Sequence, residues 1–300
     1  MTFFAPALFV LLWSTGFVGA KYGLPYAEPF SFLAVRLGVA SALLVLAMLV
    51  LRKPWPNRVQ ARHAAVSGLL LHAVYLGGVF WAIKAGMPAG IAALIVGLQP
   101  ILTAIVAKST LREQVALAQW LGLVLGLIGV TLVVASRMGN SVVAGVADVS
   151  TPSLVAAGLA LLGITLGTVY QKRFGAGTPL LGGTLVQYVA STLALTVLAF
   201  AFETRVIAWT PSFIFALGWL VLVLSFGAVL LLMGLIERNA ASSLSSLFYL
   251  VPIATAIEAY FLFGERLSPL AYGGMLIAII GVALVVLPRP KSLAVKEVTP

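Results

Sequence analysis

The chain contains an internal repeat, and this repeat constrains its fold more than any other feature. A shift of 152 positions places residues 85–137 on residues 237–289 without a gap, and 17 of these 53 pairs are identical. Shared apolar composition alone gives roughly half as many matches. A recurring segment of this length predicts two units with the same fold.

The composition indicates a membrane protein. Hydrophobic residues make up 62% of the chain and charged residues 9%, whereas a soluble domain carries about 25% charged residues. Little sequence remains outside apolar runs, which excludes a soluble catalytic or nucleic-acid-binding domain. The chain has no cysteine, so disulfides and thiolate metal sites are excluded and we expect no metal or cofactor. The first apolar run lacks the basic start and cleavage site of a secretory signal, so we expect a retained helix.

A bilayer span needs about 20 mostly apolar residues, and ten such runs are predicted. They lie near 3–20, 30–51, 64–84, 88–107, 115–136, 153–172, 180–202, 212–236, 241–263 and 268–287. The predicted fold is an all-α polytopic membrane protein with two five-helix repeats, 1–137 and 153–289, a connecting loop 138–152 and a cytoplasmic tail 290–300. An odd number of spans turns the second repeat upside down, and inverted repeats of this kind are typical of transporters with a midplane site.

The distribution of basic residues predicts that both termini are cytoplasmic. With that orientation the inside loops hold twelve Lys and Arg residues and the outside loops hold five, as the positive-inside rule requires. The net charge of +10 is therefore a signal of topology. No basic helix or basic–aromatic patch lies outside the membrane, so we expect a lipid bilayer and no nucleic acid as partner.

A few residues within this frame carry a family resemblance. The first predicted span holds a Trp-Ser-Thr-Gly stretch, the second an arginine, and the fourth and ninth each a proline followed by a glutamate: Trp13, Arg36, Pro100, Glu113, Pro252 and Glu265. This pattern resembles the drug/metabolite transporter superfamily, EamA type, and within it the YddG-type amino-acid exporters. The resemblance implies a basket-like helical bundle with a central cavity that exports amino acids or related metabolites across the bacterial inner membrane. Arg112 stands where the superfamily commonly has the glycine of a Gly-Glu pair. The second half of the chain keeps that pair.

Three features of the spans are candidates for binding and movement. Pro100 and Pro252 interrupt the fourth and ninth spans at symmetric positions, which favours hinges beside the cavity over kinks of structural value alone. Arg36 lies about 9 Å into the second span at 1.5 Å per residue. It is a candidate for binding a substrate carboxylate, and capping free carbonyls or snorkelling to the surface are open alternatives.

Two titratable residues are candidates for ion coupling. His72 and Tyr75 share a face of the third span, and His72 titrates nearest to neutral pH. A histidine in a membrane helix also serves as an interhelical hydrogen-bonding group. Glu258 is the one carboxylate within a predicted span, although the repeat places Val106 opposite it and reaching water is its simpler role. Arg36 completes this set of coupling candidates.

Aromatic and amide residues within the spans are candidates for the cavity wall. An apolar cavity with a few polar groups suits amphipathic solutes. The predicted substrate-binding residues are Trp13, His72, Tyr75, Gln99, Tyr170, Gln187, Ser245 and Tyr249. Glycine stripes recur at residues 122, 126 and 129 and at 274 and 281, and we expect close helix packing there, within the bundle or between protomers. A monomer and a homodimer both remain possible.

The predicted function is export of amino acids, aromatic or otherwise neutral, or of similar small metabolites by alternating access. Efflux of other amphipathic solutes and passive facilitation are the alternatives. The first span has no carboxylate, which disfavours proton-coupled export of cationic drugs, and Arg36 alone is too little for a phosphate ester. No nucleophile–base pair or metal motif stands on the spans, so we expect neither catalytic residues nor an enzyme.

Overall fold

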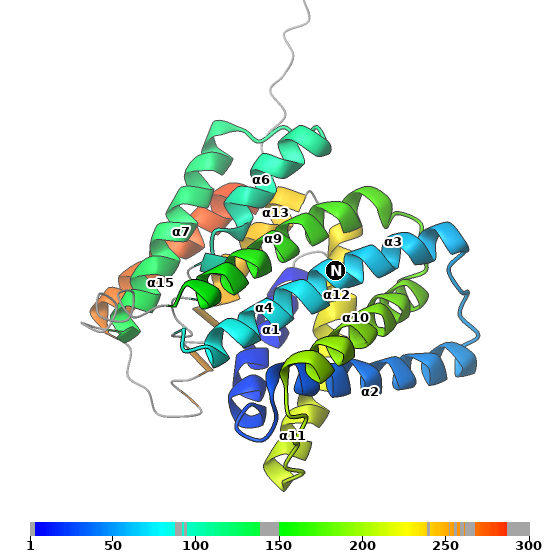
Figure 1. Ribbon diagram of the computed structural model, residues 1–300. Helices are drawn as coiled ribbons and strands as arrows, with labels where there is room; N and C mark the ends of the chain where they lie inside the picture. Colours follow the sequence, from blue (N-terminus) through cyan, green and yellow to red (C-terminus); the bar gives the residue numbers. More distant parts are fainter. Residues whose placement is uncertain are drawn as a thin grey trace, which may run out of the picture.

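The protein is all-helical within the residues that its computed structural model describes (Figure 1). These residues are 4–87, 92, 95–138, 150–238, 241–251, 253–254, 257–258, 261 and 268–286. The predicted hinge Pro252, most of the connecting loop and the tail 290–300 lie outside them. Extended structure in the described part is limited to one isolated bridge between Ala27 and Ile207.

The helices follow the predicted order. The first half holds α1 (Phe4–Gly23), α2 (Pro29–Val50), α3 (Arg58–Gly68), η1 (Leu69–Val74), α4 (Tyr75–Lys84), α6 (Gln99–Thr110) and α7 (Leu117–Met138). The second half holds α9 (Thr151–Phe174), α10 (Leu180–Phe202), α11 (Pro211–Trp219), η2 (Leu220–Ala228), α12 (Val229–Arg238), α13 (Ala241–Ser246), η3 (Leu247–Leu250) and α15 (Pro269–Val286).

Six helical stretches of the described chain are long and apolar enough to cross a membrane. They are Pro29–Val50, Arg58–Lys84, Thr151–Phe174, Leu180–Phe202, Pro211–Arg238 and Pro269–Val286. The molecule is therefore a multi-pass membrane protein. The count of ten spans and the inverted relation of the halves go beyond this finding and stay predictions.

Two helix starts differ from the sequence prediction, each for a local reason. The third span begins at Arg58, not at residue 64, because Asn57 and Gln60 form a capping box in which each side chain accepts the other's backbone N–H at 2.9 Å. The fourth span breaks at a turn over residues 97–98, and α6 starts afresh at Gln99. Pro100 thus lies in the first turn of a helix, where its missing N–H has no partner to lose.

Two long spans contain π-helical segments that periodicity did not predict. In a π-helix the backbone turn is one residue wider than in an α-helix, and such segments are often found at functional sites. η1 separates α3 from α4, and η2 separates α11 from α12. The 152-position shift carries residues 69–74 onto 221–226, which lie inside η2. The same local distortion therefore recurs at equivalent places in the two halves.

Two pairs of repeat-equivalent helices pack against each other in antiparallel fashion. In the α7–α15 pair, a Cβ on Gly122 would lie 2.5 Å from the Gly281 carbonyl oxygen, and one on Gly129 would lie 2.5 Å from the Gly274 oxygen. These stripes therefore pack within the bundle. In the α2–α10 pair, Phe30 at the start of α2 donates its N–H to Glu203, just beyond the end of α10.

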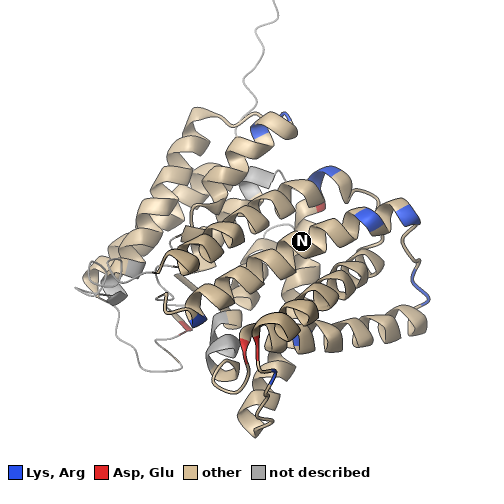
Figure 2. Cartoon of the chain, in the orientation of Figure 1, with Lys and Arg blue, Asp and Glu red and all other residues tan. Residues whose placement is uncertain are grey.

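Acidic and basic residues gather at one end of the bundle (Figure 2), and two of the acidic ones, Glu28 and Glu203, join its loops. Glu28 accepts hydrogen bonds from Lys84 Nζ at 2.5 Å and from the Thr204 backbone N–H at 2.6 Å. The Lys84 ammonium, with help from Thr204, lowers the pKa of Glu28 from 4.5 to about 2. Glu203 caps the start of α2. Three loops that the sequence assigns to the outside thus meet at one end.

Candidate functional site

Arg36 is a buried cation in the middle of the bundle. Its side chain is 4% exposed on α2, and its Nε donates to Ser225 Oγ on η2 at 3.2 Å. Within the described part of the chain, no carboxylate pairs with it; the salt bridge found there joins Lys84 and Glu28. A buried arginine without a carboxylate partner is unusual, because taking a charge out of water is costly unless it is paired. Arg36 is therefore a candidate anion-binding group.

The π segment η2 supplies backbone carbonyl groups that bond to side chains. Tyr188 of α10 donates its hydroxyl hydrogen to the Ser225 carbonyl oxygen at 2.6 Å, while Ser225 Oγ donates to the Leu220 carbonyl oxygen at 3.2 Å. Tyr188 and Ser225 are fully buried. Residues from both halves, Arg36 and Tyr188, thus converge on Ser225.

His72 on η1 joins the same region through an amide. The His72 Nε2 lies 3.3 Å from Gln187 Oε1, and Gln187 Nε2 donates to Gln171 Oε1 on α9 at 3.1 Å. Because Gln187 Oε1 can only accept, this contact is a hydrogen bond in the tautomer of His72 that carries its hydrogen on Nε2. The His72 ring also meets the edge of Tyr188 with centroids 5.1 Å apart. We call Arg36, His72, Gln171, Gln187, Tyr188 and Ser225 the central polar cluster.

A second polar contact joins α1 to the ninth span. Ser14, which is fully buried, lies 2.5 Å from Glu258 Oε1 and 2.8 Å from the Leu11 carbonyl oxygen. The other oxygen of Glu258, Oε2, is buried and has no hydrogen-bond partner among the described residues. Glu258 therefore faces the interior through Ser14, a contact that its nearness to the outer end of the span did not suggest.

Three aromatic rings from α1 and η3 pack against one another. Trp13 packs against Phe9 and Phe248 with centroids 5.3 and 5.5 Å away. Phe9 and Phe248 are themselves 5.4 Å apart, so the three rings form one group. Tyr75, 7% exposed, lies beside Trp13. Two predicted aromatic residues thus lie together.

Three further predicted residues are buried on α6, α13 and η3. Gln99 Nε2 donates to Thr103 Oγ1 at 3.3 Å, while Gln99 Oε1 has no partner among the described residues. The Tyr249 hydroxyl is likewise buried without a described partner, and its ring lies against Gly126. Ser245 is fully buried. Buried polar atoms are normally satisfied, so Gln99 and Tyr249 offer free groups to a solute or to water.

Tyr170 bonds to a residue outside the predicted set. Four residues before the end of α9, its hydroxyl pairs with His63 Nδ1 at 2.8 Å, and its ring packs against Phe174. His63 stacks on Phe174 with centroids 4.7 Å apart. The predicted third span, 64–84, leaves His63 outside it, but the early start of α3 puts His63 in a helix, where it reaches Tyr170.

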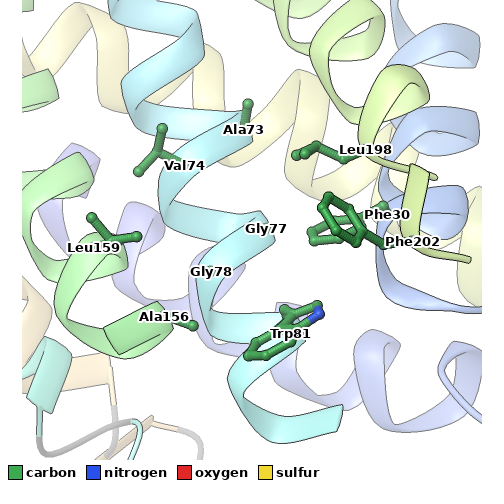
Figure 3. Close-up of a pocket in the computed structure, with 10 residues that line it drawn as sticks. All are labelled: Phe30, Ala73, Val74, Gly77, Gly78, Trp81, Ala156, Leu159, Leu198 and Phe202. Atoms are coloured by element: carbon green, nitrogen blue, oxygen red, sulfur yellow. The ribbon is translucent and has the colours of Figure 1, made fainter. Parts of the chain in front are cut away.

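A separate apolar pocket of about 300 Å³ opens on the side of the bundle (Figure 3). Gly77 and Gly78 of α4 face it between Leu159 on one side and Phe202 on the other, both of which are exposed. None of the predicted site residues lines it. Its lining suits hydrocarbon, and its place on the outer face of the spans sets it apart from the central polar cluster.

Sequence reasoning missed three members of the central polar cluster: Gln171, Tyr188 and Ser225. The repeat holds a signal for one of them, because the 152-position shift maps Arg36 onto Tyr188. No group of three His, Asp or Glu side chains that suits a metal gathers in the described part.

Comparison with known proteins gives a consistent family. The sequence profile of the EamA-like transporter family matches residues 2–135 and 151–287. The chain is 27% identical over 288 residues to the uncharacterized transporter YvbV of Bacillus subtilis (strain 168), which covers 93% of this chain and 89% of YvbV. It is 27% identical over 287 residues to the uncharacterized inner membrane transporter YedA of Escherichia coli (strain K12), which covers 94% of this chain and 89% of YedA.

A solved crystal structure has the same fold. It superposes with a TM-score of 0.74 at 21% identity, covering 94% of this chain and 96% of the other.

Proposed function

This chain belongs to the EamA-like transporter family, and we propose that it is a secondary transporter that exports amino acids or similar small metabolites by alternating access. The observation that carries this proposal is the central polar cluster, with a buried arginine that no described carboxylate neutralises. The names of the relatives state transport and no substrate. The substrate class therefore rests on the chemistry of the cluster.

That chemistry suits a zwitterion. Arg36 binds the substrate carboxylate, since a guanidinium matches a carboxylate in shape and charge. The amide oxygens of Gln171 and Gln187 are acceptors for an ammonium group. The aromatic group around Trp13, with Tyr75 beside it, offers an apolar surface to the side chain of a neutral or aromatic amino acid.

The positions of the polar residues support a site on the axis between two inverted repeats. Arg36 and Tyr188 are equivalent under the 152-position shift, and both bond to Ser225. The antiparallel contact of α7 with α15 also fits inversion, because equivalent helices of inverted units run in opposite directions. Inverted-repeat transporters bind substrate where the repeats meet and expose it by moving one repeat against the other. Pro100 and Pro252 are the hinges of this proposal.

We infer that His72 or Glu258 carries the proton if transport is coupled to one. The Ser14 hydroxyl has one hydrogen for two acceptors, Leu11 O and Glu258 Oε1, and a proton on Glu258 completes both bonds. The double variant Glu258→Gln, His72→Gln abolishes pH-driven transport and keeps substrate exchange. If the double variant keeps pH-driven transport, the coupling runs through other groups. If the unaltered protein itself shows exchange without pH-driven transport, it is a facilitator.

The name of YedA supports the inner membrane as the location, and the excess of inside arginine and lysine supports cytoplasmic termini. The test of function is counterflow of labelled amino acids in proteoliposomes. We expect saturable exchange that Arg36→Gln abolishes and Arg62→Gln, a change at an exposed arginine on α3, retains. Absence of exchange for the whole panel, with folded protein, would reject amino acids. Amino-acid exchange that is indifferent to Arg36→Gln would reject Arg36 as the group that binds the substrate carboxylate.

A further inference from the structure

A narrow polar gap runs from the central polar cluster toward the predicted cytoplasmic end. It lies between the end of α9, the start of α10 and the end of α12, and its volume is about 10 Å³. Its polar lining comprises Gln171, Thr178, Thr184, Gln187 and Glu237, with Met233 beside them. A site of this size holds about one water molecule. We call this space the inner gap.

The upper end of the inner gap is part of the central polar cluster. Gln171 and Gln187 line it and bond to each other at 3.1 Å, and Gln187 is the partner of His72. At the lower end, Thr178 Oγ1 is buried and has no partner among the described residues. A buried hydroxyl without a partner is expected to bond to water or to a solute. The gap therefore joins the cluster to the loop after α9 by polar groups.

Helix α12 closes the inner gap through two contacts. Gln187 Nε2 lies 3.5 Å from Met233 Sδ, and Lys172 Nζ donates to the Glu237 carbonyl oxygen at 2.9 Å. The first is a weak bond because sulfur is a poor acceptor, and the second is at the exposed surface. Both can break at small cost.

The π segment η2 precedes α12 and gives it a place to bend. The ladder of α-helical hydrogen bonds is interrupted over Leu220–Ala228, and helices bend at such interruptions. Gly234 on α12 has no atom within 4 Å of the position of a Cβ, so that face of the helix borders open space. A rotation of α12 about η2 would widen the gap.

We propose that the inner gap is the cytoplasmic entrance to the central polar cluster, that α12 is its gate, and that its ligands are water and small polar or zwitterionic solutes. This proposal rests on the proposed function for the identity of the solute. The entrance itself is tested without any substrate.

The absence of cysteine from the 300 residues makes that test direct. Thr184→Cys places one thiol in the gap, and Leu185→Cys places one on the next residue, equally buried but in the apolar core. A small membrane-impermeant cationic methanethiosulfonate is added to inside-out vesicles and, separately, to spheroplasts. Labelling after denaturation shows that each thiol is present.

We expect Thr184→Cys to react from the cytoplasmic side about tenfold faster than Leu185→Cys, because a thiol packed at core density is shielded until the core opens. Adding Lys172→Met, which removes one closing contact, raises the rate further. Equal rates for the two thiols, or reaction from the outside alone, would overturn the proposal. If Thr184→Cys does not fold, Thr178→Cys takes its place.

The two proposals fail separately. Fast cytoplasmic labelling without amino-acid exchange would keep the entrance and reject the substrate class. Exchange with a protected thiol would keep the transporter and place its entrance elsewhere.

Discussion

A methyl group added to Gly68 is predicted to disturb the central polar cluster without touching any polar atom. Gly68 is the last residue of α3 and lies directly against the backbone of Gln187. His72 follows one turn later on the same helical stretch. Any movement of α3 away from α10 therefore carries His72 away from its amide partner.

The size of the movement follows from the contact distances. A Cβ on Gly68 would lie 2.5 Å from the Gln187 carbonyl oxygen, whereas ordinary contact begins at 3.4 Å, so the helices must separate by about 0.9 Å. The His72–Gln187 bond is already 3.3 Å long, and a hydrogen bond does not survive that increase. Overpacking of this kind costs about 1–3 kcal/mol.

The assay compares Gly68→Ala with Gly158→Ala. Gly158 lies on α9 with no atom within 4 Å of the position of a Cβ, so alanine there gains helix propensity without a clash. We expect Gly68→Ala to lower the melting temperature of the purified protein and to reduce exchange, and Gly158→Ala to do neither. If both variants match the wild type in stability and transport, the packing of α3 on α10 does not position the cluster.

Three further predictions test other parts of the structure. Gly274→Ala brings a Cβ to 2.7 Å from a carbonyl oxygen of α7 and is expected to destabilise by about 1–3 kcal/mol, while Gly273→Ala next to it meets no atom within 4 Å and is neutral in the same thermal assay. Glu28→Gln lowers the melting temperature at neutral pH because it removes the ion pair with Lys84; since the pKa of Glu28 is lowered to about 2, that difference persists below pH 4.5 and closes only as the pH nears 2. Tyr170→Phe leaves the affinity for an exchanged substrate unchanged in counterflow, and a loss of affinity would return this residue to the site.

The sequence predicted most helices because hydrophobic runs and their breaks are local signals. It did not predict the π segments η1 and η2, because widening a helical turn by one residue changes neither composition nor apolar character. It placed Pro100 inside a span, whereas the structure starts a helix there. Proline disrupts the interior of a helix but is tolerated in its first turn. The proline alone therefore does not tell whether a span is kinked there or a new helix starts; the residues before it decide.

The side-chain partners were beyond local reasoning for a different reason. Arg36 was a candidate because of its depth, but Ser225, its partner, lies 189 residues away in sequence. In the sequence, Glu203 is simply an acidic residue at the end of a helix. In the structure it caps the start of α2, 172 residues upstream. Such contacts depend on which helices are neighbours, and hydropathy carries no information about that.

The repeat does carry such information when it is applied to single residues. The 152-position shift maps Arg36 onto Tyr188, and it maps η1 into η2, where Ser225 lies. In a pair of inverted units, equivalent residues near the axis are neighbours, so a charged residue deep in one span points to its counterpart as a partner. Here Arg36 and Tyr188 both bond to Ser225, although the two residues are of different chemical types. The block of identities from 85 to 137 made the repeat visible, but the central polar cluster lies outside that block, where the two halves have diverged in sequence and Arg36 and Tyr188 are the pair of cluster residues at equivalent positions.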